Sequence, residues 1–420
     1  MYYKEEMPNG LTILTEEMNH VRSVALGVWV DVGSRYESDE QRGISHFIEH
    51  MMFKGTHTRS ARDIAEALDA VGGQLNAFTT KEYTCYFARV LDEHFDLALD
   101  LLSDMIFASR LEEEDVDRER NVIVEEIKMY EDTPDELVHD LFAATLWQGH
   151  HLGQPIIGSA DTVVRLKRED LVRFHRHYYR PGGMVVAAAG HLDHQAVGEK
   201  IKARFAGDQR EEKHSITPPA ARSGVMCRVK DTEQVHLCVG VPGLCLADGR
   251  IYVAQLINTI LGGGISSRLF QQIREKRGLV YSVYSYHSSY HDTGIFGVYA
   301  GLSKDNAAQV LELIMREIRE IQKGGVTEAE LARAKDQLKG NLYLSLENVN
   351  TRMSRMGKSQ LYLGTVIPPE ELVARVAAVT REDLVRVAGE LFRPELFALA
   401  SIGPWQDQGE FRTTLSLLAS

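Results

Sequence analysis

Apolar and polar positions follow two alternating patterns along the chain, one typical of strands and one typical of helices. The run SVALGVWVDVG at 23–33 is almost continuously apolar, which indicates a buried strand. The Asn9-Gly10 pair before it is a hairpin signal. Residues 74–91 are rich in Thr, Tyr and Phe and predict paired strands, whereas 93–147 predict three helices with an acidic middle one. The mixture predicts an α+β fold.

The chain also contains an internal repeat. REDLVR at 168–173 returns unchanged at 381–386, an offset of 213 residues. At that offset each copy continues with an Arg-Pro pair, an apolar strand and a glycine. Such agreement in a chain of 420 residues predicts a duplicated domain, each copy a sandwich of a sheet and helices.

The repeat and the length predict two domains joined by a linker. A chain of 420 residues exceeds what one core usually holds. The polar stretch GDQREEKHSITPPAARSG at 207–224 contains a Pro-Pro pair and is typical of a linker. We therefore expect a first domain at 1–206 and a second at 225–420.

A candidate metal motif lies in the first domain. In GISHFIEHMM, His46, Glu49 and His50 stand at positions i, i+3 and i+4, so a helix would present all three on one face. Two imidazoles at this spacing can bind one Zn²⁺, while the carboxylate between them deprotonates water. The repeat offset places TILGG at 259–263, so the second domain lacks the motif. Chance can also produce such a pattern, and a further ligand is needed.

The third ligand is sought in the acidic helix at 112–132. Glu119 and Glu126 are seven residues apart, so they share a helix face, and the apolar NVIV between them indicates partial burial. A buried carboxylate needs a cation or a donor. Spacing alone favours Glu126, with Glu119 and Glu125 as rivals.

The motif GISHFIEHMMFKGT together with the acidic helix resembles the pitrilysin, or insulinase, family of zinc metallopeptidases, the inverzincins. The resemblance covers essentially the whole chain. It is closest in kind to short bacterial members related to the β subunit of the mitochondrial processing peptidase. It implies that His46 and His50 bind zinc, that Glu49 is the general base, that Glu126 is the third ligand, and that Glu119 supports the ligands from behind.

The resemblance also implies substrate-binding residues in both halves. Arg274 and Tyr281 match an Arg and a Tyr that family members project toward the substrate, where both are donors suited to an oxyanion. Without the family, a surface arginine and a core tyrosine would explain them. The stretch GGQLNAFTTKEYT resembles the family's substrate-binding strand, which binds an extended peptide through Asn76, Ala77, Phe78 and Thr79. An ordinary interior strand fits the composition equally well.

Composition limits the partners. The net charge of −13 argues against nucleic-acid binding. No 18 consecutive apolar residues occur, so we expect no membrane insertion. The four cysteines form no Cys-x-x-Cys pair and favour reduced thiols and a cytoplasmic protein.

The combined expectation is a zinc metalloendopeptidase with one Zn²⁺ per chain that hydrolyses unstructured peptides or extended segments. Metal ligands from the first half and hydrogen-bond donors from the second half would meet in a clam-like chamber. A homodimer is expected because short family members are often paired. The alternative is a non-catalytic assembly subunit of the same fold. Zinc-dependent hydrolysis of other carbonyl compounds is compatible with the same residues.

Overall fold

The computed structural model describes residues 2–207 and 217–406. Contacts between residues divide the chain into two compact units. The first unit draws its described residues from Met1–Met129, Pro155–Ile216 and Ser345–Val366. The second draws them from Tyr130–Gln154, Thr217–Leu344 and Ile367–Ser420.

The first unit is built on a six-stranded sheet in the order β1-β2-β6-β3-β5-β4. Its strands are β1 (Tyr2–Glu6), β2 (Thr12–Glu17), β3 (Ser23–Val30), β4 (Gln74–Thr79), β5 (Thr84–Leu91) and β6 (Met184–Gly190). The β2–β6 pair is parallel and the other pairs are antiparallel. β4 is the last strand in this order, so one of its edges lies outside the sheet.

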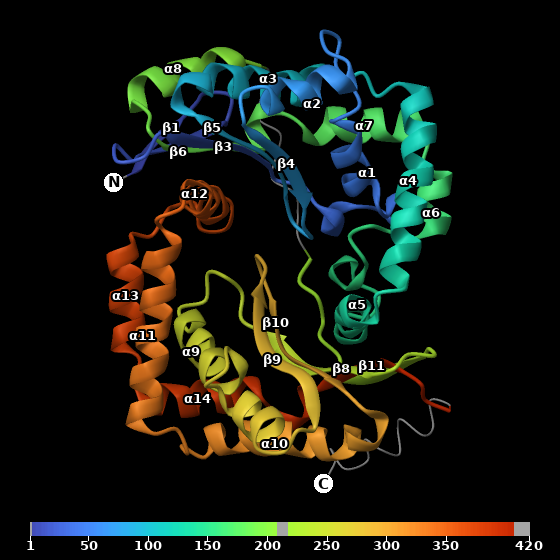
Figure 1. Ribbon diagram of the computed structural model, residues 1–420, viewed down its shortest axis with the longest axis vertical. Helices are drawn as coiled ribbons and strands as arrows, with labels where there is room; N and C mark the ends of the chain where they lie inside the picture. The colour runs from blue at the N-terminus through green and yellow to red at the C-terminus, as the bar shows by residue number, and fades with distance from the viewer. Residues whose placement is uncertain (1, 208–216, 407–420) are drawn as a thin grey trace. The chain divides into compact units, whose positions relative to one another are not determined.

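Helices cover both faces of this sheet (Figure 1). One face packs against a core shared with α1 (Ile44–Met51), α2 (Ala61–Asp69), α3 (Phe95–Ala108), α4 (Glu113–Glu131), α6 (Ala160–Arg165), α7 (Arg168–Tyr178) and α8 (His194–Arg204). The other face packs against α12 (Val349–Leu363), where Trp29 meets Met353 and Met356. The pleat of β3 explains this division, because its successive side chains enter the two cores alternately.

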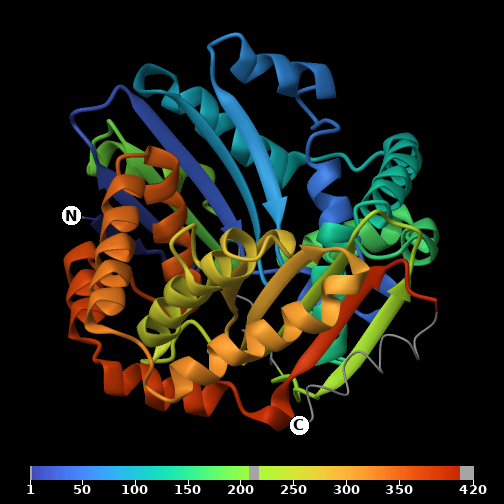
Figure 2. The same cartoon turned by 60° about the horizontal axis from the view of Figure 1, so that its bottom comes forward.

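The second unit contains a five-stranded sheet in the order β7-β11-β8-β10-β9. Its strands are β7 (Gly224–Val229), β8 (Val235–Gly243), β9 (Val280–Ser289), β10 (Gly294–Leu302) and β11 (Ala398–Gly403). Figure 2 shows the parallel pair, β7 in yellow-green and β11 in red. The remaining helices are α5 (Pro134–Leu146), α9 (Ile251–Gly262), α10 (Ala307–Gln322), α11 (Glu328–Ser345), α13 (Pro369–Ala378) and α14 (Arg381–Leu391).

The two units repeat one topology, as the sequence repeat predicts. Without β1, the strand order of the first sheet matches that of the second when each set is numbered along the chain. The two REDLVR copies begin α7 and α14, and each helix is followed by a short helical turn and a central strand. The predicted α+β fold of two similar sheet-and-helix domains is confirmed.

Each compact unit contains one helix that comes from the other side of the predicted domain boundary. α5 precedes the boundary in sequence but belongs to the second unit, where it packs against β8 and β11. α12 follows the boundary but belongs to the first unit. Of the predicted linker at 207–224, residues 208–216 lie outside the described part, and β7 begins at Gly224.

None of the described helices combines the length and the apolar character that crossing a membrane requires. The four cysteines are thiols that form no disulfide; Cys85, Cys227 and Cys238 are buried and Cys245 is half-buried.

Candidate metal centre

Helix α1 presents three polar side chains on one face and mainly apolar side chains on the others. His46, Glu49 and His50 are half-buried. The apolar anchors, all fully buried in the core of the first unit, are Ile44, Phe47, Ile48 and Met51. Because close-packed anchors resist rotation of the helix, the direction of the polar face is fixed.

The N-terminus of α1 is held by the buried carboxylate of Glu37. Its Oε2 accepts a hydrogen bond from the Gly43 amide at 2.7 Å, and its Oε1 accepts one from the Ser45 amide at 2.8 Å. Gly43 adopts φ of 92°, a left-handed conformation that favours glycine. Burial raises the pKa of Glu37 to about 7, although the two amide hydrogen bonds lower it. Glu37 therefore satisfies helix donors that would otherwise be buried without partners.

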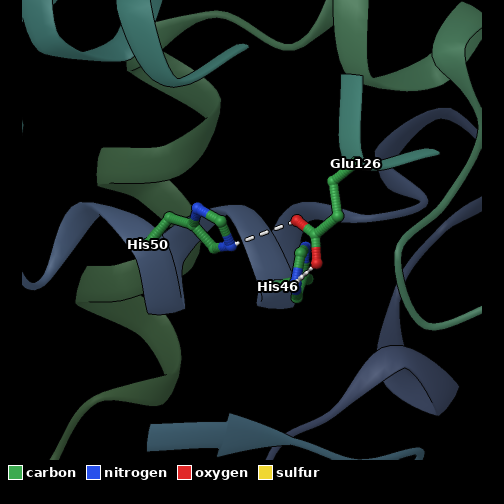
Figure 3. Close-up of side chains that lie close together, drawn as sticks. All are labelled: His46, His50 and Glu126. Atoms are coloured by element: carbon green, nitrogen blue, oxygen red, sulfur yellow. Dashed lines mark ion pairs between the residues drawn. The ribbon is translucent and has the colours of Figure 1, made fainter. Parts of the chain in front are cut away.

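Glu126 of α4 faces both histidines of α1 (Figure 3). Its Oε1 lies 3.8 Å from His46 Nε2, and its Oε2 lies 3.5 Å from His50 Nε2. One donor atom from each residue fits within 4.8 Å of the others. Ligands of a tetrahedral zinc ion stand roughly 3.4 Å apart, so this arrangement fits such an ion. No second group of three His, Cys, Asp or Glu side chains gathers in this way among the described residues.

Glu119 and Glu125, the two rivals of Glu126, point elsewhere. Glu119 is buried, and its Oε2 lies 3.2 Å from His50 Nδ1, the ring nitrogen that faces away from Glu126. Its Oε1 lies 2.6 Å from Lys54 Nζ. Glu125 is exposed and pairs with Lys128 at 2.6 Å on the outer face of α4. Because of the orientation of α4 about its own axis, Glu126 faces the two histidines and Glu119 lies behind His50.

Glu49 is oriented by the neighbouring strand. Thr79 Oγ1 of β4 donates a hydrogen bond of 2.5 Å to Glu49 Oε2. Burial raises the pKa of Glu49, while the bond from Thr79 opposes that rise. A carboxylate with a raised pKa is a stronger base than one in water, which suits proton abstraction near neutral pH.

The two histidines differ in their surroundings. Burial, together with a smaller effect of the nearby His50, lowers the pKa of His46 to about 3. A neutral imidazole is the form that binds a metal. His46 Nδ1 is buried without a hydrogen-bond partner among the described residues, whereas His50 Nδ1 has Glu119. The two imidazoles and Glu126 therefore supply three donors of the kinds that zinc accepts, and only one imidazole is braced from behind.

The predicted substrate strand is β4, the edge strand of the first sheet. Thr79 and Ala77 point toward the core that contains α1, whereas Asn76 and Phe78 are exposed on the opposite face. The Asn76 side chain accepts a hydrogen bond of 2.8 Å from the Ala77 amide. The position of β4 satisfies the first requirement for strand addition, a free edge.

Arg274 and Tyr281 lie side by side in the second unit. The Arg274 guanidinium lies 5.7 Å from the centre of the Tyr281 ring and 4.9 Å from that of Phe270. Arg274 belongs to a π-helical turn, Phe270–Glu275, a geometry often found at functional sites. Tyr281 on β9 is 74% exposed, so its hydroxyl is available to another molecule. The expected approach of this pair to the metal ligands stays a prediction.

Sequence reasoning did not identify Lys54 or Glu37 as part of this centre. Lys54 lies four residues after His50, and both side chains contact Glu119. This spacing is informative only once the position of Glu119 is known. Glu37 precedes α1 by seven residues and has no motif of its own. The contact of Lys54 with Glu119 depends on packing between segments that are distant in sequence, whereas Glu37 contacts a helix that begins only seven residues later.

The fold and the donor set together define a duplicated α+β protein with a candidate metal centre in its first unit. Residues 12–160 match the model of Insulinase (Peptidase family M16), and residues 165–338 match that of the Peptidase M16 inactive domain. The chain is 45% identical over 396 residues to the uncharacterized zinc protease YmxG of Bacillus subtilis, covering 94% of this chain and 97% of that protein. The chain belongs to peptidase family M16, the insulinase family.

Other relatives and solved structures agree with this assignment. The uncharacterized zinc protease SCO5738 of Streptomyces coelicolor is 45% identical over 413 residues, covering 96% of this chain and 89% of that protein. A protease from Helicobacter pylori matches the fold with a TM-score of 0.91 at 23% identity, covering 96% of this chain and 99% of that structure. An M16 inactive-domain structure from Pseudomonas fluorescens has a TM-score of 0.89 at 21% identity, covering 96% and 98%. These structural likenesses support the fold.

Proposed function

We propose that the protein is a zinc-dependent endopeptidase that cleaves unstructured peptides or extended segments. The observation that carries the proposal is the donor set of His46, His50 and Glu126, with Glu49 on the same helix face. Membership of family M16 and the relatives named as zinc proteases support it. One Zn²⁺ per chain is expected, because the three residues form the one such group in the described part of the chain.

Zinc held by these three residues would supply a Lewis acid for the scissile carbonyl and make a nearby water acidic, with a pKa of about 7 in such sites. Glu49 takes the proton from the attacking water and later delivers it to the leaving amine nitrogen. Thr79 keeps one oxygen of Glu49 in place, so the other is free to face the water. Both residues therefore act on proton transfer.

The substrate is proposed to bind as an added strand on β4. Asn76, Ala77 and Phe78 provide main-chain groups along this edge, and Thr79 ends the strand beside Glu49. Main-chain pairing requires an extended substrate, which favours unstructured segments over folded proteins. Arg274 and Tyr281 of the second unit are proposed to stabilise the oxyanion.

Several finer expectations come from family resemblance or, for the location of the protein, from its four cysteines. A homodimer, a cytoplasmic location and a role in precursor processing stay predictions. The alternative function is a non-catalytic assembly subunit of the same fold. A complete donor set with its candidate base favours the enzyme, because a purely structural subunit needs neither.

The experiment that tests the function is cleavage of a mixed pool of unstructured peptides, analysed by mass spectrometry, with bound zinc measured in each preparation. Wild type should cleave, and Glu49→Gln should retain zinc but lose roughly 10²–10⁴-fold in rate. A zinc-loaded wild type that cleaves no peptide would contradict the proposal and favour the assembly role. Cleavage within peptides, rather than stepwise trimming, would establish the endopeptidase type.

A further inference from the structure

Lys54 stands behind the candidate metal centre at a place that no ligand motif requires. Its Nζ lies 2.6 Å from Glu119 Oε1, while His50 Nδ1 lies 3.2 Å from Glu119 Oε2. Two residues four positions apart, one at the end of α1 and one just beyond it, therefore hold the two oxygens of a single carboxylate on α4. The Glu119 side chain is 5% exposed and that of Lys54 is 32% exposed.

This arrangement solves an electrostatic problem. A buried carboxylate without a positive partner is costly, and a neutral His50 supplies a hydrogen bond but no charge. The Lys54 ammonium supplies the compensating charge. Removing it would leave Glu119 held through one oxygen only, with a buried negative charge facing the back of His50.

The same contact fixes the two segments that supply the ligands. Glu119 and Glu126 are seven residues apart on α4 and share a helix face. An ion pair that holds Glu119 against the end of α1 therefore also determines where Glu126 points. His46 has no comparable support behind its ring, since its Nδ1 has no partner among the described residues. The orientation of the three candidate ligands therefore depends on the contacts behind His50, which are made by Glu119 and Lys54.

We propose that Lys54 is a positioning residue that sets the zinc affinity of the centre through Glu119 and His50. It touches neither metal nor substrate. The inference rests on the proposed zinc site. Groups behind metal ligands typically change metal affinity 10–100-fold when they are removed.

The test is the zinc dissociation constant, measured by competition with a chromophoric chelator, for wild type, Lys54→Met, Lys54→Arg and Lys128→Met. Lys128→Met is the matched control, because it removes an exposed lysine that pairs with Glu125 on α4. We expect Lys54→Met to weaken zinc binding at least tenfold, Lys54→Arg to stay within threefold of wild type, and the control to be unchanged. At saturating zinc, KM for a cleaved peptide should stay within twofold in every variant.

Unchanged zinc affinity in Lys54→Met would overturn the inference, and so would equal weakening by Met and Arg, because the charge would then be irrelevant. If Lys54→Met does not fold, Lys54→Gln, which keeps a donor but no charge, carries the same comparison. A wild type that binds zinc but cleaves no peptide would contradict the proposed function while leaving the affinity comparison valid. A wild type that binds no zinc would overturn both.

Discussion

Thr79 Oγ1 donates a 2.5 Å hydrogen bond to Glu49 Oε2, which connects the edge strand β4 to the candidate base on α1. The bond joins the element proposed to bind substrate to the residue proposed to move the proton. Because Thr79 ends β4, a peptide added to that strand would extend directly toward Glu49. Substrate binding and base orientation therefore share one residue.

Replacing Thr79 with valine should lower kcat about tenfold, since valine keeps the shape of threonine but cannot hold the carboxylate. Thr79→Ser should retain most of the activity because it keeps the hydroxyl. Both variants should bind zinc as wild type does. Steady-state kinetics with one peptide and a zinc assay check this, and full activity in Thr79→Val would show that the bond does not orient Glu49.

The packing of α12 against the first sheet predicts a stability effect. A Cβ added at Gly357 would lie 2.5 Å from Trp29 Cδ2, closer than atoms can approach. Gly357→Ala should lower the free energy of unfolding by about 1–3 kcal/mol. Gly340 of α11 is the control, because a Cβ there meets nothing within 4 Å. Gly340→Ala should leave stability unchanged or raise it by up to about 1 kcal/mol.

Urea unfolding of both glycine variants measures the difference. Equal stability in Gly357→Ala and wild type would mean that α12 does not pack closely on Trp29. That result would also contradict the exchange of helices between the two units.

The raised pKa of Glu37 predicts that the folding stability depends on pH. Its folded pKa of about 7 lies above the usual value of 4.5, so the folded protein binds a proton that the unfolded chain has released between these values. Its contribution to stability is fully present below pH 4.5 and is lost as the pH rises to 7, by roughly 3 kcal/mol. The stability of wild type relative to Glu37→Gln should therefore fall from pH 5 to pH 7.5. A constant difference, measured by urea unfolding at each pH, would contradict this account.

Helix periodicity was sufficient to predict the polar face of α1. His46, Glu49 and His50 share a face through spacing alone, and the structure shows that face turned toward α4. Spacing favoured Glu126 as the third ligand but left Glu119 and Glu125 as rivals. The choice depends on which face of α4 is buried, and that is a property of tertiary packing.

Long-range partnerships were the part that the sequence could not predict. Lys54 meets Glu119 across 65 positions, and Thr79 meets Glu49 across 30. The sequence could not predict the placement of α12 on the first sheet either, because an amphipathic helix can cover any apolar sheet face. The repeat predicted that the two halves share one fold, because the same sequence pattern occurs in both at a constant offset.

The most direct measurement is the titration of zinc into metal-free protein while peptide cleavage is followed. Activity should rise linearly and stop at one zinc per chain in wild type and in Glu125→Gln, whose side chain is exposed on the outer face of α4. Glu126→Gln should need at least tenfold more zinc, because it loses one of three protein ligands. Full cleavage activity of Glu126→Gln at one zinc per chain would contradict the account. Cleavage by wild type that does not depend on zinc would also contradict it.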